Sequence, residues 1–366
     1  MNALGLSLLV AAACFGQQAG VYKDARDVPR GYYGPERDDP EPQGLDAVRI
    51  GYFGPSDPQH PDGGAMWLAV NRAIEEANRE GGYKGLPFRL VPGWSENPWA
   101  GGISSVTRMV YNDKVWAILG SIDGASTHLA EQVVAKARLT LIDPASTDDS
   151  VNQANVAWVF SCVPGDRPSA AVIGESLLKA GSFSLLTATD HDSRAIAAQL
   201  NSFLTARKAA PRQHVEFAPA ATQAAEAIAL DVAAVVVLAG PADSARMVRA
   251  LRSRRADLLI YGGPTMGRQS FLEAAGAAAE GVRFPLLVED STTDYAALDA
   301  YDATRILVAA IRKAGLNRAR IRDAVEELAP WSGVSGVIRW DALGRNSRPV
   351  HLGTVRDGRA RELDAD

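Results

Sequence analysis

The sequence predicts an α/β protein with two open parallel sheets, each covered by helices on both faces. From residue 47 onward, short apolar runs alternate with amphipathic segments, which is the layout of parallel sheets with crossover helices. The alternation stops at Pro164 and then starts again. The chain has 366 residues, 47% of them hydrophobic, which is enough for two domain-sized cores.

The first unit opens with a strand at 48–53. Apolar residues then recur with the spacing of one buried helix face, at positions 66, 69, 70, 73, 74 and 77. The rest of the unit is expected as a strand at 88–91, a helix at 101–112, a strand at 115–119, a helix at 126–137 and a strand at 139–142.

The second unit repeats this order after Pro164. We expect helices at 168–180, 194–207, 243–254 and 268–276, and strands at 184–188, 215–218, 234–238 and 258–261. The remaining residues predict helices at 296–314 and 318–328, followed by a β-hairpin that pairs 337–340 with 350–355 around a turn at 341–345.

The N-terminus predicts export. Residues 3–13 form an apolar run that is too short to span a bilayer of roughly 30 Å, so residues 1–14 are interpreted as a signal peptide. The run ends in Val-Ala-Ala-Ala-Cys, which resembles a bacterial lipobox with Cys14 as the acylated residue. The alternatives are ordinary signal cleavage nearby and a wrongly assigned start codon. Residues 15–46, rich in Gly, Pro and charge, are expected to form a flexible tether.

Several groups of residues together resemble the type I periplasmic binding proteins of the Leu/Ile/Val-binding family. These are the runs at 50–55, 76–85, 115–121, 144–147, 279–282 and 333–341, whose order and spacing match over about 310 residues. The resemblance implies two Rossmann-like lobes joined by a three-segment hinge. Lobe one would combine 47–163 with 286–336, and lobe two would combine 164–285 with 337–366.

In that family the ligand lies between the lobes, beyond the carboxyl ends of the strands. The resemblance therefore points to two loops of lobe one as the grip on a ligand carboxylate. The candidate residues are Ser121, Asp123, Gly124 and Ser126 in the first loop, and Ala145, Ser146 and Thr147 in the second. The family's serine in the first loop aligns with Gly124. The alternative for this loop is helix capping without a ligand.

Lobe two departs from the family pattern. The usual tyrosine loop is replaced by a polar loop with Asp190, Asp192 and Ser193, and the usual acidic residue is replaced by Pro264 or Thr265. Either aspartate could compensate a ligand ammonium group, or the loop could simply cap the next helix. Trp94 is expected either to stack on the ligand or to cover the surface of lobe one.

Other function classes lack their motifs. The chain has no dinucleotide glycine fingerprint, nucleophile elbow, P-loop or zinc-protease pattern, so we expect neither an enzyme nor a cofactor. The triplet at 190–192 is weak as a metal site, and none is expected. The net charge of −5 without basic runs argues against nucleic acid. A buried, structural Cys162 is expected.

The sequence thus predicts an exported solute-binding protein of an ABC-type importer, located in the periplasm or anchored to the membrane as a lipoprotein. Its expected partners are a small polar ligand, namely an amino acid, an amide or another small carboxylate, and a membrane permease. The alternative of the same fold is an extracytoplasmic ligand sensor that signals through a partner protein. An α/β enzyme is the remote alternative.

Overall fold

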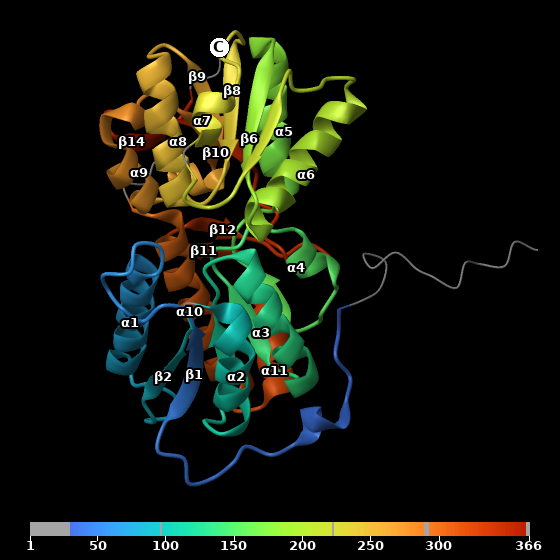
Figure 1. The fold of residues 1–366 in the computed structure, drawn as a ribbon. Coiled ribbons are helices and arrows are strands. Elements are labelled where there is room, and N and C mark those ends of the chain that lie inside the picture. Colours follow the sequence, from blue (N-terminus) through green and yellow to red (C-terminus); the bar gives the residue numbers. More distant parts are fainter. Residues whose placement is uncertain (1–29, 96, 222, 289–292, 364–366) are drawn as a thin grey trace, which may run out of the picture.

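The computed structural model describes residues 30–363 except 96, 222 and 289–292, and it consists of two lobes, one above the other in Figure 1. The expected signal peptide and Cys14 lie outside the described residues. Both lobes are α/β units with mainly parallel sheets, so the fold class predicted from the sequence is confirmed. Cys162 is buried as a free thiol. No helix among the described residues is long and apolar enough to cross a membrane.

Lobe one contains a five-stranded parallel sheet in the order β2-β1-β3-β4-β5. Its strands are β1 (Val48–Phe53), β2 (Phe88–Gly93), β3 (Ala117–Leu119), β4 (Thr140–Asp143) and β5 (Val159–Ser161). One face packs on α1 (Gly64–Arg79), α10 (Tyr295–Ala314) and α11 (Arg318–Glu327). The other packs on α2 (Pro98–Tyr111) and α3 (Gly124–Ala137). The short α4 (Ser150–Gln153) follows the loop after β4.

Lobe two contains a seven-stranded sheet in the order β14-β13-β10-β9-β8-β6-β7. Its strands are β6 (Phe183–Ala188), β7 (His214–Phe217), β8 (Ala234–Leu238), β9 (Leu259–Gly262), β10 (Arg283–Leu286), β13 (His351–Arg356) and β14 (Arg359–Glu362). Its helices are α5 (Asp166–Ala180), α6 (His191–Ala206), α7 (Gln223–Ala227), α8 (Pro241–Arg254) and α9 (Gln269–Ala275). Cores on both faces of this sheet bury α7, α8 and α9 on one side and α5 and α6 on the other. Two 3₁₀ turns, η3 (Pro264–Gly267) and η4 (Gly276–Ala279), flank α9.

The chain passes between the lobes after β5, after β10 and again before β13. Residues 339–346 still lie against lobe one, because the Trp340 indole donates to Val325 O and Ser161 N donates to Gly344 O. These contacts lie beyond residue 336, where the sequence predicted the end of lobe one.

The predicted hairpin is wrong. β12 (Gly336–Ile338) pairs with β11 (Trp331–Gly333), and β13 pairs with β10 and β14. The turn at 341–345 exists, with Asp341 N donating to Arg345 O, but it closes only one bridge, between Trp340 and Asn346. The two apolar runs belong to different lobes, which local patterning cannot reveal.

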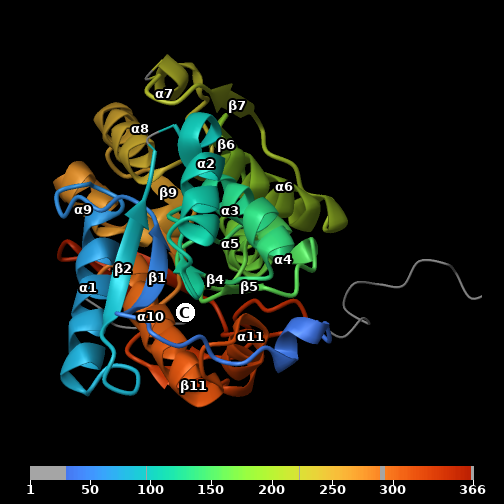
Figure 2. The same ribbon diagram turned by 90° about the horizontal axis from the view of Figure 1, so that it is seen from below.

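Residues 30–46, the described part of the expected tether, run along lobe one, as the blue segment at the bottom of Figure 1 and in Figure 2 shows. Arg30 is buried and donates to Val156 O at 3.1 Å. The 3₁₀ turn η2 (Pro35–Asp38) lies against α11, where the Asn317 amide donates to Glu36 O at 2.7 Å. This stretch is docked because its backbone carbonyls and its arginines find partners on the lobe.

Candidate functional site

A cavity of about 460 Å³ lies between the two lobes, at the carboxyl ends of their parallel strands. Lobe one contributes the loops after β1, β3 and β4 and the first turns of α2 and α10; lobe two contributes the segments after β6, β8 and β9. Ligands of open α/β sheets bind at such edges. The cavity is therefore the candidate binding site.

Eight of the residues singled out from the sequence line this cavity: Asp123, Ala145, Ser146, Thr147, Asp190, Asp192, Ser193 and Thr265. The structure brings together segments about 140 residues apart in the chain. Their role in binding a ligand stays a prediction.

Four others do not line it. Ser121 and Ser126 are buried and hydrogen-bond to each other, Oγ to Oγ, at 2.7 Å. Trp94 packs on Phe53, with ring centroids 5.4 Å apart, so of the two placements expected for it the structure has the one on lobe one. Gly124 lies just behind the cavity wall. The tryptophan that reaches the cavity is Trp99, in the first turn of α2 and 69% exposed.

The N-terminus of α3 is occupied by a carboxylate from the other lobe. Gly124 N donates to Asp192 Oδ1 at 2.7 Å, and Ala125 N to Asp192 Oδ2 at 3.4 Å. Asp192 belongs to the first turn of α6, which begins three residues earlier than the sequence predicts. A Cβ atom at position 124 would lie 2.7 Å from Asp192 Oδ1, so only glycine leaves room for this contact.

The other donors expected to hold a ligand carboxylate are also engaged. Ala145 N and Ser146 N donate to Asp143 Oδ1 at 3.0 and 2.9 Å. Thr147, in the same loop, acts on the buried Asp166 carboxyl and opposes the rise that burial causes in its pKa. Burial raises the pKa of Asp143 to about 7 and raises the pKa of Asp166 well above its ordinary value. Protein carboxylates therefore take the donors of both lobe-one loops.

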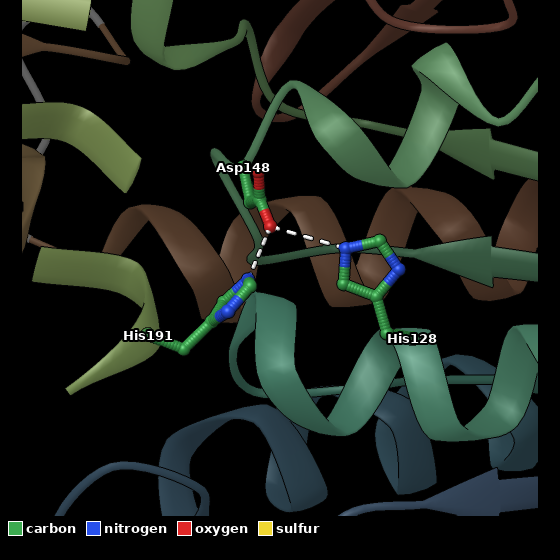
Figure 3. A group of neighbouring side chains, drawn as sticks. All are labelled: His128, Asp148 and His191. Carbon is green, nitrogen blue, oxygen red and sulfur yellow. Dashed lines mark hydrogen bonds and ion pairs between the residues drawn. The ribbon is translucent and has the colours of Figure 1, made fainter. Parts of the chain in front are cut away.

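Three side chains from the two lobes meet as Figure 3 shows, and one of them, His191, also lines the cavity. His191 Nε2, at the start of α6, lies 2.7 Å from Asp148 Oδ2, and His128 Nε2 of α3 lies 3.2 Å from the same oxygen. Hydrogen bonds to Asp148, then to Glu131, raise the pKa of His128 to about 10. Burial opposes ionisation of Asp148, but the hydrogen bonds from the two histidines outweigh it and lower its pKa.

This histidine and aspartate group is the set among the described residues that could hold a metal ion, since its ligand atoms lie within 4.8 Å of one another. Two imidazoles and a carboxylate suit Zn²⁺. Both histidines, however, already pair with Asp148, and Ser150 Oγ lies 2.8 Å from His128 Nε2. As it stands, the group is an ion-pair bridge between the lobes.

Two arginines that support the site were missed from the sequence. Arg268 of lobe two forms a buried ion pair with Asp294 at 2.8 Å and donates to Asp62 O in lobe one at 2.6 Å. Arg345 is buried and donates to Ser146 O at 3.0 Å and to Val163 O at 3.3 Å. Neither lies in a motif, because their partners are backbone carbonyls or residues distant in the chain.

Comparison with known proteins matches this chain to a family model and to a curated relative. The family model described as "Periplasmic binding protein" matches residues 47–292. A curated relative, an "Amino acid binding protein" of Pseudomonas aeruginosa, is 27% identical over 132 residues, which span 36% of this chain and 35% of that protein.

Solved structures share the fold. The branched-chain amino acid transporter substrate-binding protein LivJ of Streptococcus pneumoniae, in complex with isoleucine, superimposes with a TM-score of 0.77 at 21% identity, covering 87% of this chain and 99% of LivJ. A solute-binding protein from R. palustris in complex with benzoate gives a TM-score of 0.76 at 16% identity, covering 87% of this chain and 95% of that one.

Proposed function

Because this chain belongs to the periplasmic binding protein family, we propose that it is the exported solute-binding component of an ABC-type importer and closes around one small polar ligand. The observation that carries the proposal is the cavity of about 460 Å³ lined by strand-end loops of both lobes. A ligand that contacts both lobes stabilises the closed state. The family's members bind solutes for transport and are not enzymes.

The domain arrangement that we propose follows the three passages between the lobes. Lobe one would comprise residues 47–163 and the segment that follows residue 286, and lobe two residues 164–285 and the end of the chain. The contacts of Trp340 and Arg345 with lobe one support a third crossing after Asn346 and not after residue 336. Small rotations at these crossings would open the cavity.

Solved relatives suggest where to begin the ligand search. LivJ was crystallised with isoleucine and the R. palustris protein with benzoate, so the fold accepts both zwitterions and aromatic anions. The panel for this chain should therefore contain amino acids, amides, small carboxylates and amines.

The test is a thermal-shift screen of the purified protein with this panel, followed by titration calorimetry of each hit. A ligand present at 100 times its Kd should stabilise the folded state by about 2.7 kcal/mol. Calorimetry should give one site per chain. If no class of compound raises the melting temperature, the solute-binding proposal is wrong.

A further inference from the structure

Carboxyl groups of the protein already occupy the donors that a ligand carboxylate would be expected to use. Asp192 holds the two N–H groups at the start of α3, and Asp143 holds those of the loop after β4. Asp123 caps α3 by accepting from Ser126 N at 2.8 Å. A ligand carboxylate would have to displace these groups and would then lie beside them, and like charges at this distance repel.

The charged side chains that line the cavity also argue against a ligand carboxylate. Four aspartates line it: Asp62, Asp123, Asp190 and Asp192. Among the described residues none of the four forms a side-chain ion pair, although the Arg268 guanidinium donates to the backbone oxygen of Asp62 and the charge of His191 acts on Asp192. The basic groups on the wall, His191 and Arg268, are instead paired with Asp148 and Asp294, which do not line the cavity.

Aromatic side chains lie on the same wall. Trp99 is exposed at the start of α2, whereas Tyr295, at the start of α10, is buried and has the Arg268 guanidinium over its ring at 5.5 Å from the centroid. The face of an aromatic ring attracts an ammonium or guanidinium group. Four aspartates without a side-chain ion pair, with the exposed Trp99 ring on the same wall, form an environment that an organic cation would neutralise.

We propose that the ligand is an organic cation without a carboxylate, namely an alkyl or aryl amine, a diamine or a guanidine, with its charged group beside Asp190 and Asp192. This inference rests on the proposed solute-binding function and specifies its ligand class. In this proposal Asp192 accepts hydrogen bonds from the N-terminus of α3 and also contributes negative charge to the cavity.

The test compares amino acids with the amines that remain when their carboxylate is removed. The pairs are leucine and isoamylamine, phenylalanine and phenethylamine, arginine and agmatine, and ornithine and putrescine. Calorimetry on the wild-type protein should show at least one amine that binds about tenfold or more tighter than its amino acid. The anions 4-methylpentanoate and 3-phenylpropanoate should not bind.

Two variants separate the charge of Asp192 from its shape. Asp192→Asn keeps the side chain's size, and we expect amine affinity to fall by about tenfold or more while any amino-acid binding changes less. Asp257→Asn removes an equal charge from an 82% exposed side chain of the same lobe and should leave both affinities unchanged.

The outcomes are distinct. Tighter binding of an amino acid or an anion than of its amine would overturn the cation proposal and leave the solute-binding proposal standing. No binding in any of the pairs or by either anion would overturn the cation proposal, while the solute-binding proposal falls only if the wider thermal-shift panel also gives no hit. Because the comparison of paired ligands uses the wild-type protein, it remains decisive even if Asp192→Asn fails to fold.

Discussion

At the scale of single residues, Asp148 joins the lobes because it accepts from both His128 and His191. His128 also lies 2.9 Å from the buried Glu131, so it offsets two carboxylates that have little access to water. Removing one partner of such a group costs more than the pair itself contributes, since the remaining charges stay buried.

We therefore expect His128→Gln to lower the free energy of unfolding by about 3 kcal/mol at pH 6. The pKa of His128 is raised to about 10, so its stabilising charge is fully present below the unfolded value of about 6.5 and is lost as pH rises through 10. The difference from wild type should shrink between pH 6 and 9 in denaturant titrations. His351→Gln, at an exposed pair, should cost less than about 1 kcal/mol. A pH-independent difference would contradict the ionic role.

Asp192 gives amine binding a pH dependence. Burial, then the charge of Asp123, raises its pKa to about 7, while Gly124 N, His191 and Asp148 also face it. A bound cation favours the ionised carboxylate, so binding should release a proton below pH 7. We expect amine affinity to rise on the order of tenfold from pH 5.5 to pH 8 in calorimetry. In Asp192→Asn the profile should be much flatter; an equally steep one would assign the titration to another group.

The sequence indicated some site residues and missed others for physical reasons. Asp190 and Asp192 could be picked out because polar residues directly after a strand reach the edge of a sheet. The hydrogen bonds from the N-terminus of α3 to Asp192 could not be predicted, because they depend on the distance between two lobes. Arg268 and Arg345 gave no signal, because an arginine that binds carbonyls has no sequence pattern.

At the scale of elements, the loop after β4 is held from outside. Arg345, in the turn that precedes β13, donates to the carbonyls of Ser146, Asp148 and Val163, two of which belong to the loop on the cavity wall. The guanidinium thus fixes the position of a cavity loop from a segment about 200 residues further along the chain.

Replacing Arg345 with Met should leave these carbonyls without donors and Asp149 without its cation, and should destabilise the protein by roughly 3–5 kcal/mol. Ligand affinity should fall as well, because the loop after β4 loses its support. Chemical unfolding and calorimetry measure the two effects. Arg345→Lys should be intermediate, and Met at the exposed Arg359 should be nearly neutral. Full stability of Arg345→Met would show that the loop is held by its own bonds.

Most elements followed from local patterning. Apolar periodicity predicted the positions of many elements, because each of them buries one face or both. These are the strands β1, β4, β6 and β8 and the helices α1, α3, α8 and α10. β5 and β10 were not predicted as strands. Each is only three or four residues long and lies where the chain passes between the lobes. Its pairing with neighbouring strands, and not its own sequence, makes it a strand.

At the scale of the whole molecule, two groups of side chains beside the cavity connect the lobes. One is the His191 and Asp192 group against α3 and Asp148. The other comprises Arg268 and Ser270 against Asp62, where the Ser270 hydroxyl donates to Asp62 Oδ1 at 2.9 Å. Both groups connect the lobes directly, so side-chain contacts add to the hinge segments in holding the lobes together.

Weakening both groups should favour an open molecule. The double variant His191→Ala/Ser270→Ala removes one hydrogen bond from each, which together contribute about 1–3 kcal/mol to closure. We expect a larger radius of gyration in small-angle X-ray scattering without ligand, and the wild-type value at saturating ligand. Apparent affinity should fall in proportion to the lost closed population. His214→Ala/Ser253→Ala, whose bonds stay within lobe two, is the control. If both double variants scatter like wild type, closure rests on the hinge segments instead of these contacts.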